Sequence, residues 1–190
     1  MSCSFTVIPG AGRTKGFWHN DNGKDLLALC DPAWRVALND LCLRRPDGSV
    51  FLVPTGTDFD TAFDALSNFL VGEGVHGEAA NQLSTQLAAT VLNNLCGFMQ
   101  GVIYVDVAGD GVLISLESLI EGARTLLCDD NANDTGPDTA FPTLRTTILN
   151  CLNEYNNINE TGDLNNPQIV YGVSEGPEEF VSPYGDEFEL

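Results

Sequence analysis

Apolar residues recur at spacings of three and four in several segments of this 190-residue chain, and this periodicity constrains the fold more than any other feature. Such spacing places apolar side chains on one face of an α-helix. Short apolar runs between turn residues are fewer, and they predict only short strands. We therefore expect a mainly α protein. The helices are expected over 26–30, 32–41, 58–70, 78–96, 115–128 and 142–155, and the strands over 1–10, 50–53, 102–105 and 169–173.

The stretch from Tyr104 to Asp138 carries the most distinctive chemistry of the chain. It reads as a short strand, an acidic glycine-containing loop, a helix capped by Ser115, a cysteine, and a loop made almost wholly of Asp and Asn. Carboxylate and amide oxygens without basic neighbours are ligands that calcium prefers. We expect structural Ca²⁺ at one or both ends of this helix.

The first of these loops follows the outline of an EF-hand calcium loop. Asp106 and Asp110 stand at positions one and five, a glycine stands at position six, and Glu117 stands at position twelve. Two usual ligand positions hold Ala108 and Ile114 instead. The alternative is a plain turn followed by an acid in the first turn of the helix.

The second loop is the better cation candidate. Asp129, Asn131 and Asn133 alternate along it, so their oxygens can converge on one centre, and Asp134 and Asp138 could complete the shell. The alternative is a solvated turn, because Asp and Asn are also common turn residues.

A third candidate places Asp21 and Asp25 in 11–25, which we expect to be a structured loop. The only histidines, His19 and His76, would need distant partners to hold zinc, so we expect no zinc site. We also expect no enzyme. The GxSxG pattern at 172–176 has no histidine after it, and acids such as Asp58 suggest a hydrolase only weakly in so acidic a chain.

Six cysteines are spread along the chain, and none lies in a CxxC pair. An even number without a zinc pattern predicts three disulfides and an oxidising compartment. The alternative is six buried thiols in a cytosolic protein. The pairing stays open among 15 connectivities. The cysteines are Cys3, Cys30, Cys42, Cys96, Cys128 and Cys151.

Acidic residues outnumber basic ones, 27 to 8, and the excess is uneven along the chain. Residues 1–46 hold six basic and four acidic residues, and the other 144 hold two basic and 23 acidic ones. This excludes nucleic acid as an expected partner, since phosphate contacts need Lys and Arg. Solubility, a saline habitat or bound divalent cations would each account for the acidity. We expect no membrane span, and 1–10 lack the basic and apolar regions of a signal peptide.

The chain divides into an α-rich domain over 1–166 and an extended acidic segment over 167–190. The last 17 residues hold six acids and no base. This segment is either a solvated tail or a strand that docks on a neighbouring subunit. The side chains expected to make such an intersubunit contact are Phe180, Val181, Tyr184 and Phe188.

The segment TKGFWHN, from Thr14 to Asn20, resembles the Thr-x-Gly-(Tyr/Phe)-Trp-Lys-Asn motif of a family of bacterial secreted and surface proteins. The likeness extends in order over about 13–157, through FDALSNFL, QLSTQLAATVLNNLCG, ISLESLIEGARTLL and LNEYNN. His19 stands where the family usually has Lys. The resemblance implies an extracellular or cell-surface protein without enzymatic activity.

Taken together, these features predict an irregular, disulfide-bonded helical domain with a few short β-strands and an extended acidic C-terminal segment. The expected function is an extracellular structural protein, a calcium-stabilised subunit that assembles with copies of itself into a filament, tube or surface layer. The alternative is a monomeric secreted or surface module that binds a glycan or a protein.

Overall fold

The computed structural model describes residues 12–71, 79–98, 103–106, 113–128, 142–157 and 169–171. Over these residues the protein is mainly helical with a few short strands, so the predicted fold class is confirmed. No described helix is both long and apolar enough to cross a bilayer. The elements are α1 (Lys15–Trp18), α2 (Asp21–Leu29), α3 (Ala33–Asn39), α4 (Phe59–Val71), α5 (Ala79–Leu95), β1 (Ile103–Asp106), β2 (Leu113–Ser115), α6 (Leu116–Cys128), α7 (Pro142–Asn156) and β3 (Ile169–Tyr171).

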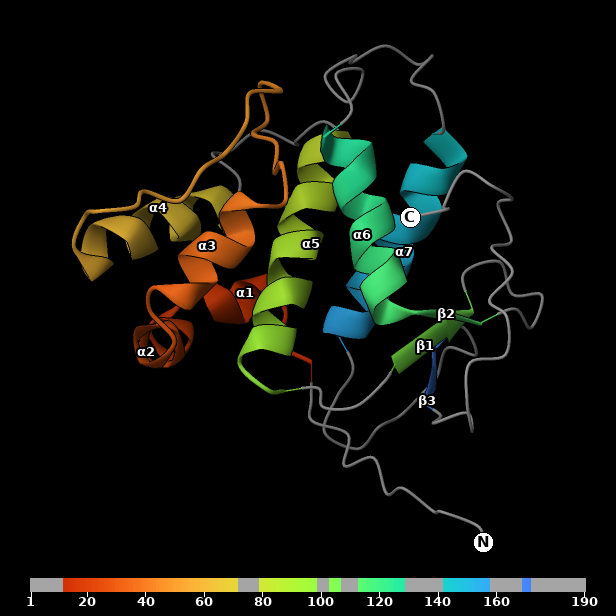
Figure 1. Ribbon diagram of the computed structural model, residues 1–190, viewed down its shortest axis with the longest axis horizontal. Helices are drawn as coiled ribbons and strands as arrows, with labels where there is room; N and C mark the ends of the chain where they lie inside the picture. Colours follow the sequence, from red (N-terminus) through yellow and green to blue (C-terminus); the bar gives the residue numbers. More distant parts are fainter. Residues whose placement is uncertain are drawn as a thin grey trace, which may run out of the picture.

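Helix α5 is the centre of the molecule (Figure 1). It contacts α1 and α3 on one side and α6 and α7 on the other. Its sequence explains this position, because Leu83, Leu87 and Leu92 are fully buried while Ala88 and Ala89 let other helices approach closely. The 17-residue α5 thus joins the N-terminal helices and the α6–α7 pair into one apolar core.

The core draws on the apolar face of each predicted helix. In α4 the buried positions follow the helical period, and in α6 they do the same. Two aromatic rings, Phe51 and Phe69, stack at a centroid distance of 4.0 Å and fix the segment after α3 against α4. The largest fully buried side chains are Trp18, Trp34, Phe51, Leu27, Leu38, Leu43, Leu66, Leu70, Leu83, Leu87 and Leu92.

The three described strands form one antiparallel sheet in the order β2-β1-β3, near the N-terminal end of α6 (Figure 1). Tyr104 faces Ser115 across one pairing and Val170 across the other. Strand β3 lies within 167–190, the segment expected to be an extension, and it pairs with β1 of the same chain. The first part of that segment therefore contributes to the sheet.

Most of the region 11–25, expected to be a structured loop, is helical: α1 covers 15–18 and α2 begins at Asp21, so the loop prediction is wrong for these residues. The side-chain oxygen of Asn20 accepts hydrogen bonds from the backbone N–H groups of Asn22 and Gly23, at 3.0 and 3.3 Å, and so starts α2. Gly23 permits α1 and α2 to touch, because a Cβ there would lie 2.5 Å from the carbonyl oxygen of Phe17. In this segment a run rich in Gly, Asn and Asp therefore supplies a helix cap and close contact between α1 and α2.

The strand expected over 50–53 is also absent, apart from an isolated bridge between Arg44 and Val50. The side chain of Asn39 takes the place of a partner strand. Its Nδ2 donates to the Val53 carbonyl at 3.0 Å, and the Val53 N–H donates to its Oδ1 at 2.7 Å. The backbone at 53 is therefore satisfied without a sheet.

Candidate functional site

Strands β1 and β2 pair antiparallel, and β2 leads directly into α6. Asp106 ends β1 and pairs in register with Leu113 of β2, so the first predicted cation loop is entered from a strand. Ser115 caps α6 as predicted, since the Ser118 N–H donates to its Oγ at 3.1 Å. Glu117 is exposed in the first turn, and Asp110 lies outside the described residues. A cation site here remains a prediction.

The other end of α6 is covalently fixed. Cys128, its last residue, forms a disulfide with Cys42, which follows α3. Beside it, the Nε and Nη2 of Arg44 both donate to the carbonyl of Leu127, at 2.9 and 2.8 Å. Arg44 is only 7% exposed, and its N–H donates to Ser84 Oγ of α5 at 2.8 Å. A disulfide and a buried guanidinium together hold the C-terminus of α6 against the N-terminal half.

The favoured cation loop follows directly, and its residues Asp129, Asn131, Asn133, Asp134 and Asp138 lie outside the described residues. The structure nevertheless defines where that loop begins. Its first residue comes two positions after the carbonyl that Arg44 binds. A guanidinium there stabilises nearby carboxylates as anions but opposes a divalent cation by like-charge repulsion. The carbonyl two residues before this loop therefore binds a buried positive charge, which the sequence alone did not predict.

The third candidate, Asp21 with Asp25, lies on one exposed face of α2. Between them Lys24 turns to α4, and its Nζ lies 2.7 Å from Asp60 Oδ1. The hydrogen bond and charge of Asp60, with Asp64 and Asp21 adding to it, raise the pKa of Lys24. Across the described ranges, no three or more His, Cys, Asp or Glu side chains gather closely enough to hold a metal ion. A calcium ion at Asp21 and Asp25 stays a prediction.

A second pair of cysteines meets where the ends of α2 and α5 come together. The Sγ atoms of Cys30, at the end of α2, and Cys96, just after α5, are 3.3 Å apart. Burial raises the pKa of Cys96 to about 12, and its hydrogen bond with Cys30 acts in the same direction. Cys151 is buried in α7, and Cys3 lies outside the described residues. The fold thus brings together four of the six cysteines, which sequence alone could not pair.

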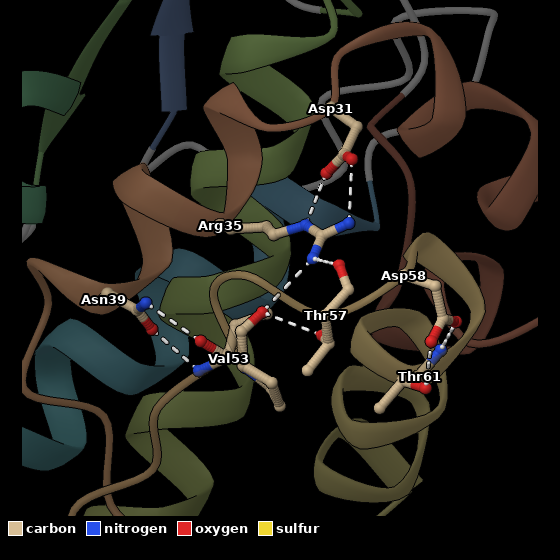
Figure 2. Close-up of polar contacts among 8 residues, drawn as sticks. Asp31, Arg35, Asn39, Val53, Thr57, Asp58 and Thr61 are labelled. Atoms are coloured by element: carbon tan, nitrogen blue, oxygen red, sulfur yellow. Dashed lines mark hydrogen bonds and ion pairs between the residues drawn. The ribbon is translucent and has the colours of Figure 1, made fainter.

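A polar cluster that sequence reasoning missed joins α3 to the segment before α4 (Figure 2). The guanidinium of Arg35 forms a two-point ion pair with Asp31, at 2.5 and 2.8 Å. Its Nη1 also donates to the carbonyls of Pro54 and Thr57, at 3.2 and 3.0 Å. The i,i+4 spacing of Asp31 and Arg35 was the available signal. The N-cap residue of α3 is Pro32, so Asp31 acts through its ion pair and not as the cap.

The residues of the TKGFWHN segment form part of the packed core and its surrounding contacts. It forms α1, in which Trp18 is fully buried and packs edge-on against Phe17 and Phe98. The guanidinium of Arg13 lies over the rings of Phe17 and Phe98, at 5.2 and 4.8 Å from their centroids. His19 accepts a hydrogen bond from Ser67 Oγ through its backbone carbonyl. These contacts anchor α1 to α4 and α5.

The chain matches no protein-family model, and comparisons with curated proteins and with solved structures find no match either. The resemblance to bacterial surface proteins therefore remains an expectation. The side chains expected at an intersubunit contact, at 180, 181, 184 and 188, lie outside the described residues, as does His76.

Proposed function

We propose that this chain is an extracellular structural protein, a calcium-stabilised subunit that assembles with copies of itself into a filament, tube or surface layer. The observation that carries the proposal is the disulfide between Cys42 and Cys128. Disulfides persist in secreted and surface proteins and are rare in reducing compartments. This bond joins residues 86 positions apart, and the segment after it is the favoured cation loop.

Charge supports the calcium part of the proposal. The formal net charge is −19, so most carboxylates have no basic residue available to pair with. A compact chain of this charge repels itself, and bound divalent cations relieve that repulsion more effectively than monovalent salt.

Exposed apolar side chains on the N-terminal half support self-association. Leu29 of α2 is 83% exposed, Val36 of α3 is 57% exposed and Leu52 is 56% exposed. Apolar area in contact with water is stabilised when another surface covers it. A glycan-binding or protein-binding monomer would use the same residues for a different partner, and this is the second candidate.

Thermal unfolding with and without chelator tests the calcium part. We expect EDTA to lower the melting temperature and added Ca²⁺ to restore it, because an ion that binds only the folded state stabilises that state. Mg²⁺ and NaCl at matched ionic strength control for screening. An identical melting temperature in EDTA and in Ca²⁺ would remove calcium from the proposal.

Negative-stain electron microscopy and light scattering at rising protein concentration in Ca²⁺ test the assembly part. Regular filaments, tubes or sheets are expected. Discrete particles of one chain's mass at every concentration would contradict assembly and favour the monomeric binding module. Deleting residues 174–190 then tests the tail, and assembly that is unaltered by the deletion would exclude it from the contact.

A further inference from the structure

Cys30 and Cys96 occupy a position where a bond between them would cross-link two helices. They are 66 residues apart in sequence, yet their sulfurs lie 3.3 Å apart. Cys30 closes α2 and Cys96 follows the last residue of α5. Both side chains are half-buried, so a small reagent can reach them from solvent.

The hydrogen bonds define how the two thiols are arranged. The single hydrogen of Cys30 is donated to the carbonyl of Leu26, at 3.2 Å. The S–H of Cys96 is therefore the donor in the sulfur–sulfur contact, and it points at the Cys30 sulfur. Either thiol can start the exchange once it has lost its proton, and the raised pKa of Cys96 disfavours that loss at Cys96.

We propose that Cys30 and Cys96 are a second disulfide site, closed by exchange with an organic disulfide such as glutathione disulfide. The Cys30 thiolate attacks one sulfur of glutathione disulfide and expels one glutathione thiolate. Cys96 then loses its proton, attacks the Cys30 sulfur of the mixed disulfide and expels the second glutathione thiolate. The two protein thiols are oxidised to one disulfide, and glutathione disulfide is reduced to two glutathione thiols, which take up the two protons.

The geometry requires little movement for this reaction. A disulfide bond is about 2.0 Å long, so the two sulfurs must approach each other by about 1.3 Å. Cys96 lies beyond the end of α5, where the chain turns at Gly97 with a φ of 72°. We expect rotation of the two side chains to supply most of this approach, because Cys96 lies outside the helix.

The second bond would cross the first along the sequence. Cys30 precedes Cys42, and Cys96 lies between Cys42 and Cys128, so the two covalent loops share residues 42–96. That shared stretch contains α4 and α5, and both bonds would therefore restrict the same part of the unfolded chain. Closing the bond needs an oxidising supply of glutathione disulfide, but it needs no contact between copies of the protein.

Peptide mapping of the full-length chain tests the proposal. Cleavage after Lys and Arg places all six cysteines in separate peptides, with Cys30 in 25–35, Cys42 in 36–44, Cys96 in 45–124 and Cys128 in 125–145. The folded protein is reduced, freed of reductant and incubated with glutathione disulfide. Remaining thiols are alkylated, and the chain is digested without reduction.

The expected result is peptide 25–35 linked to 45–124, together with 36–44 linked to 125–145. Alkylated, unlinked 25–35 and 45–124 beside an intact Cys42–Cys128 link would overturn the proposal, as would 25–35 linked to any other peptide. The variant Cys30→Ser/Cys96→Ser is the matched control. It should keep the 36–44 to 125–145 link and melt below the oxidised wild-type protein, and a melting temperature equal to the wild type would also count against the second bond. If the variant fails to fold, the wild-type peptide map alone decides.

Discussion

Arg35 satisfies three other groups from within the short helix α3. It is 4% exposed, it pairs with the Asp31 carboxylate, and it donates to the carbonyls of Pro54 and Thr57. Removing such a charge leaves a carboxylate and two carbonyls without their partner, and that loss exceeds the net contribution of the intact pair. Arg35 therefore fixes the path of the chain from α3 to α4 together with Asn39 and the Phe51–Phe69 stack.

We predict that Arg35→Met lowers the free energy of unfolding by about 3 kcal/mol, the low end for breaking a buried pair, because Asp31 keeps some contact with water. Urea denaturation, followed by circular dichroism, measures this change in the free energy of unfolding. Lys15→Met removes an exposed basic residue of α1 and should stay within about 0.5 kcal/mol of the wild type. Equal midpoints for the two variants would show that Arg35 does not join the segments.

The carboxylate of Asp58 makes a pH-dependent interaction at the start of α4. The N–H and hydroxyl of Thr61 both donate to its carboxylate at 2.8 Å, and these bonds lower the pKa of Asp58. A carboxyl whose pKa is lower in the folded state stabilises that state above its unfolded pKa, and the contribution is lost as the pH falls through the folded pKa. The stabilising effect of this cap should therefore be present at neutral pH and disappear in acid.

Carbon-detected NMR titration of the carboxyl groups checks this prediction. Asp58 should titrate below the ordinary Asp range, and Thr61→Ala should move its pKa upward by removing the hydroxyl bond. Asp47 provides an internal control, since Ser49 lowers its pKa through separate bonds that the substitution leaves intact. An unchanged Asp58 titration in Thr61→Ala would refute the assigned cause.

At the scale of elements, α5 and α7 are joined by a network of buried amides as well as by apolar contact. The Oδ1 of Asn156 accepts from Thr90 and Asn93, at 3.1 and 2.8 Å, and its Nδ2 donates to the carbonyl and side chain of Gln86, both at 3.0 Å. Asn93 in turn pairs with the backbone of Arg13 through both its amide groups. The network sets the register of α7 on α5.

Asn156→Leu should therefore lower the free energy of unfolding by about 2–3 kcal/mol, because it removes the acceptor of a buried Asn93 N–H and of the buried Thr90 hydroxyl, which keeps only its bond to the Gln86 carbonyl. The neighbouring Asn157, exposed at the end of α7, is the matched control, and Asn157→Leu should change stability by about 0.5 kcal/mol or less. Chemical denaturation compares the two. A leucine at 156 that stabilises the protein would show that apolar packing alone holds α7.

Helix positions could be predicted because their signal is local and periodic. The helices expected at 58–70, 78–96, 115–128 and 142–155 match α4, α5, α6 and α7 within about two residues. The helix expected over 32–41 likewise matches α3, whereas the one expected over 26–30 covers only the end of α2, and α1 was not predicted. Helix α2 begins at a side-chain cap and packs against α1 through a glycine, and neither feature leaves an apolar period. Strand β2 was not predicted, because three residues next to a helix are too few to show the alternation of a strand.

At the scale of the whole molecule, the Cys42–Cys128 bond closes a loop that contains α4, α5, β1, β2 and α6. Closing a loop of that length restricts the unfolded chain, and this effect stabilises the folded state by about 4 kcal/mol. We predict that Cys42→Ser/Cys128→Ser loses about this much in guanidinium unfolding, and that reductant then has less effect on the variant than on the wild type. Equal unfolding midpoints for wild type and variant under oxidising conditions would contradict the prediction.

Candidate sites were harder to predict than helices, because a site depends on residues that are distant in sequence. The even cysteine count predicted disulfides, but only the fold brings Cys42 to Cys128 and Cys30 to Cys96. The acidic loops could be found from composition, yet the guanidinium of Arg44 at the end of α6 comes from 83 residues away. Charge at a site is a property of the packed chain, and local motifs do not report it.

The disulfide also governs what happens when the backbone is cut. A single hydrolysed peptide bond anywhere between 42 and 128 leaves two fragments that the bond still joins, so the protein keeps its mass until it is reduced. Residues 46–123 contain no Lys or Arg, so trypsin-like proteases find no cleavage site in that stretch at all. The stretch between 42 and 128 is therefore protected in two ways: it has few sites for trypsin-like proteases, and the disulfide holds the fragments together after a cut.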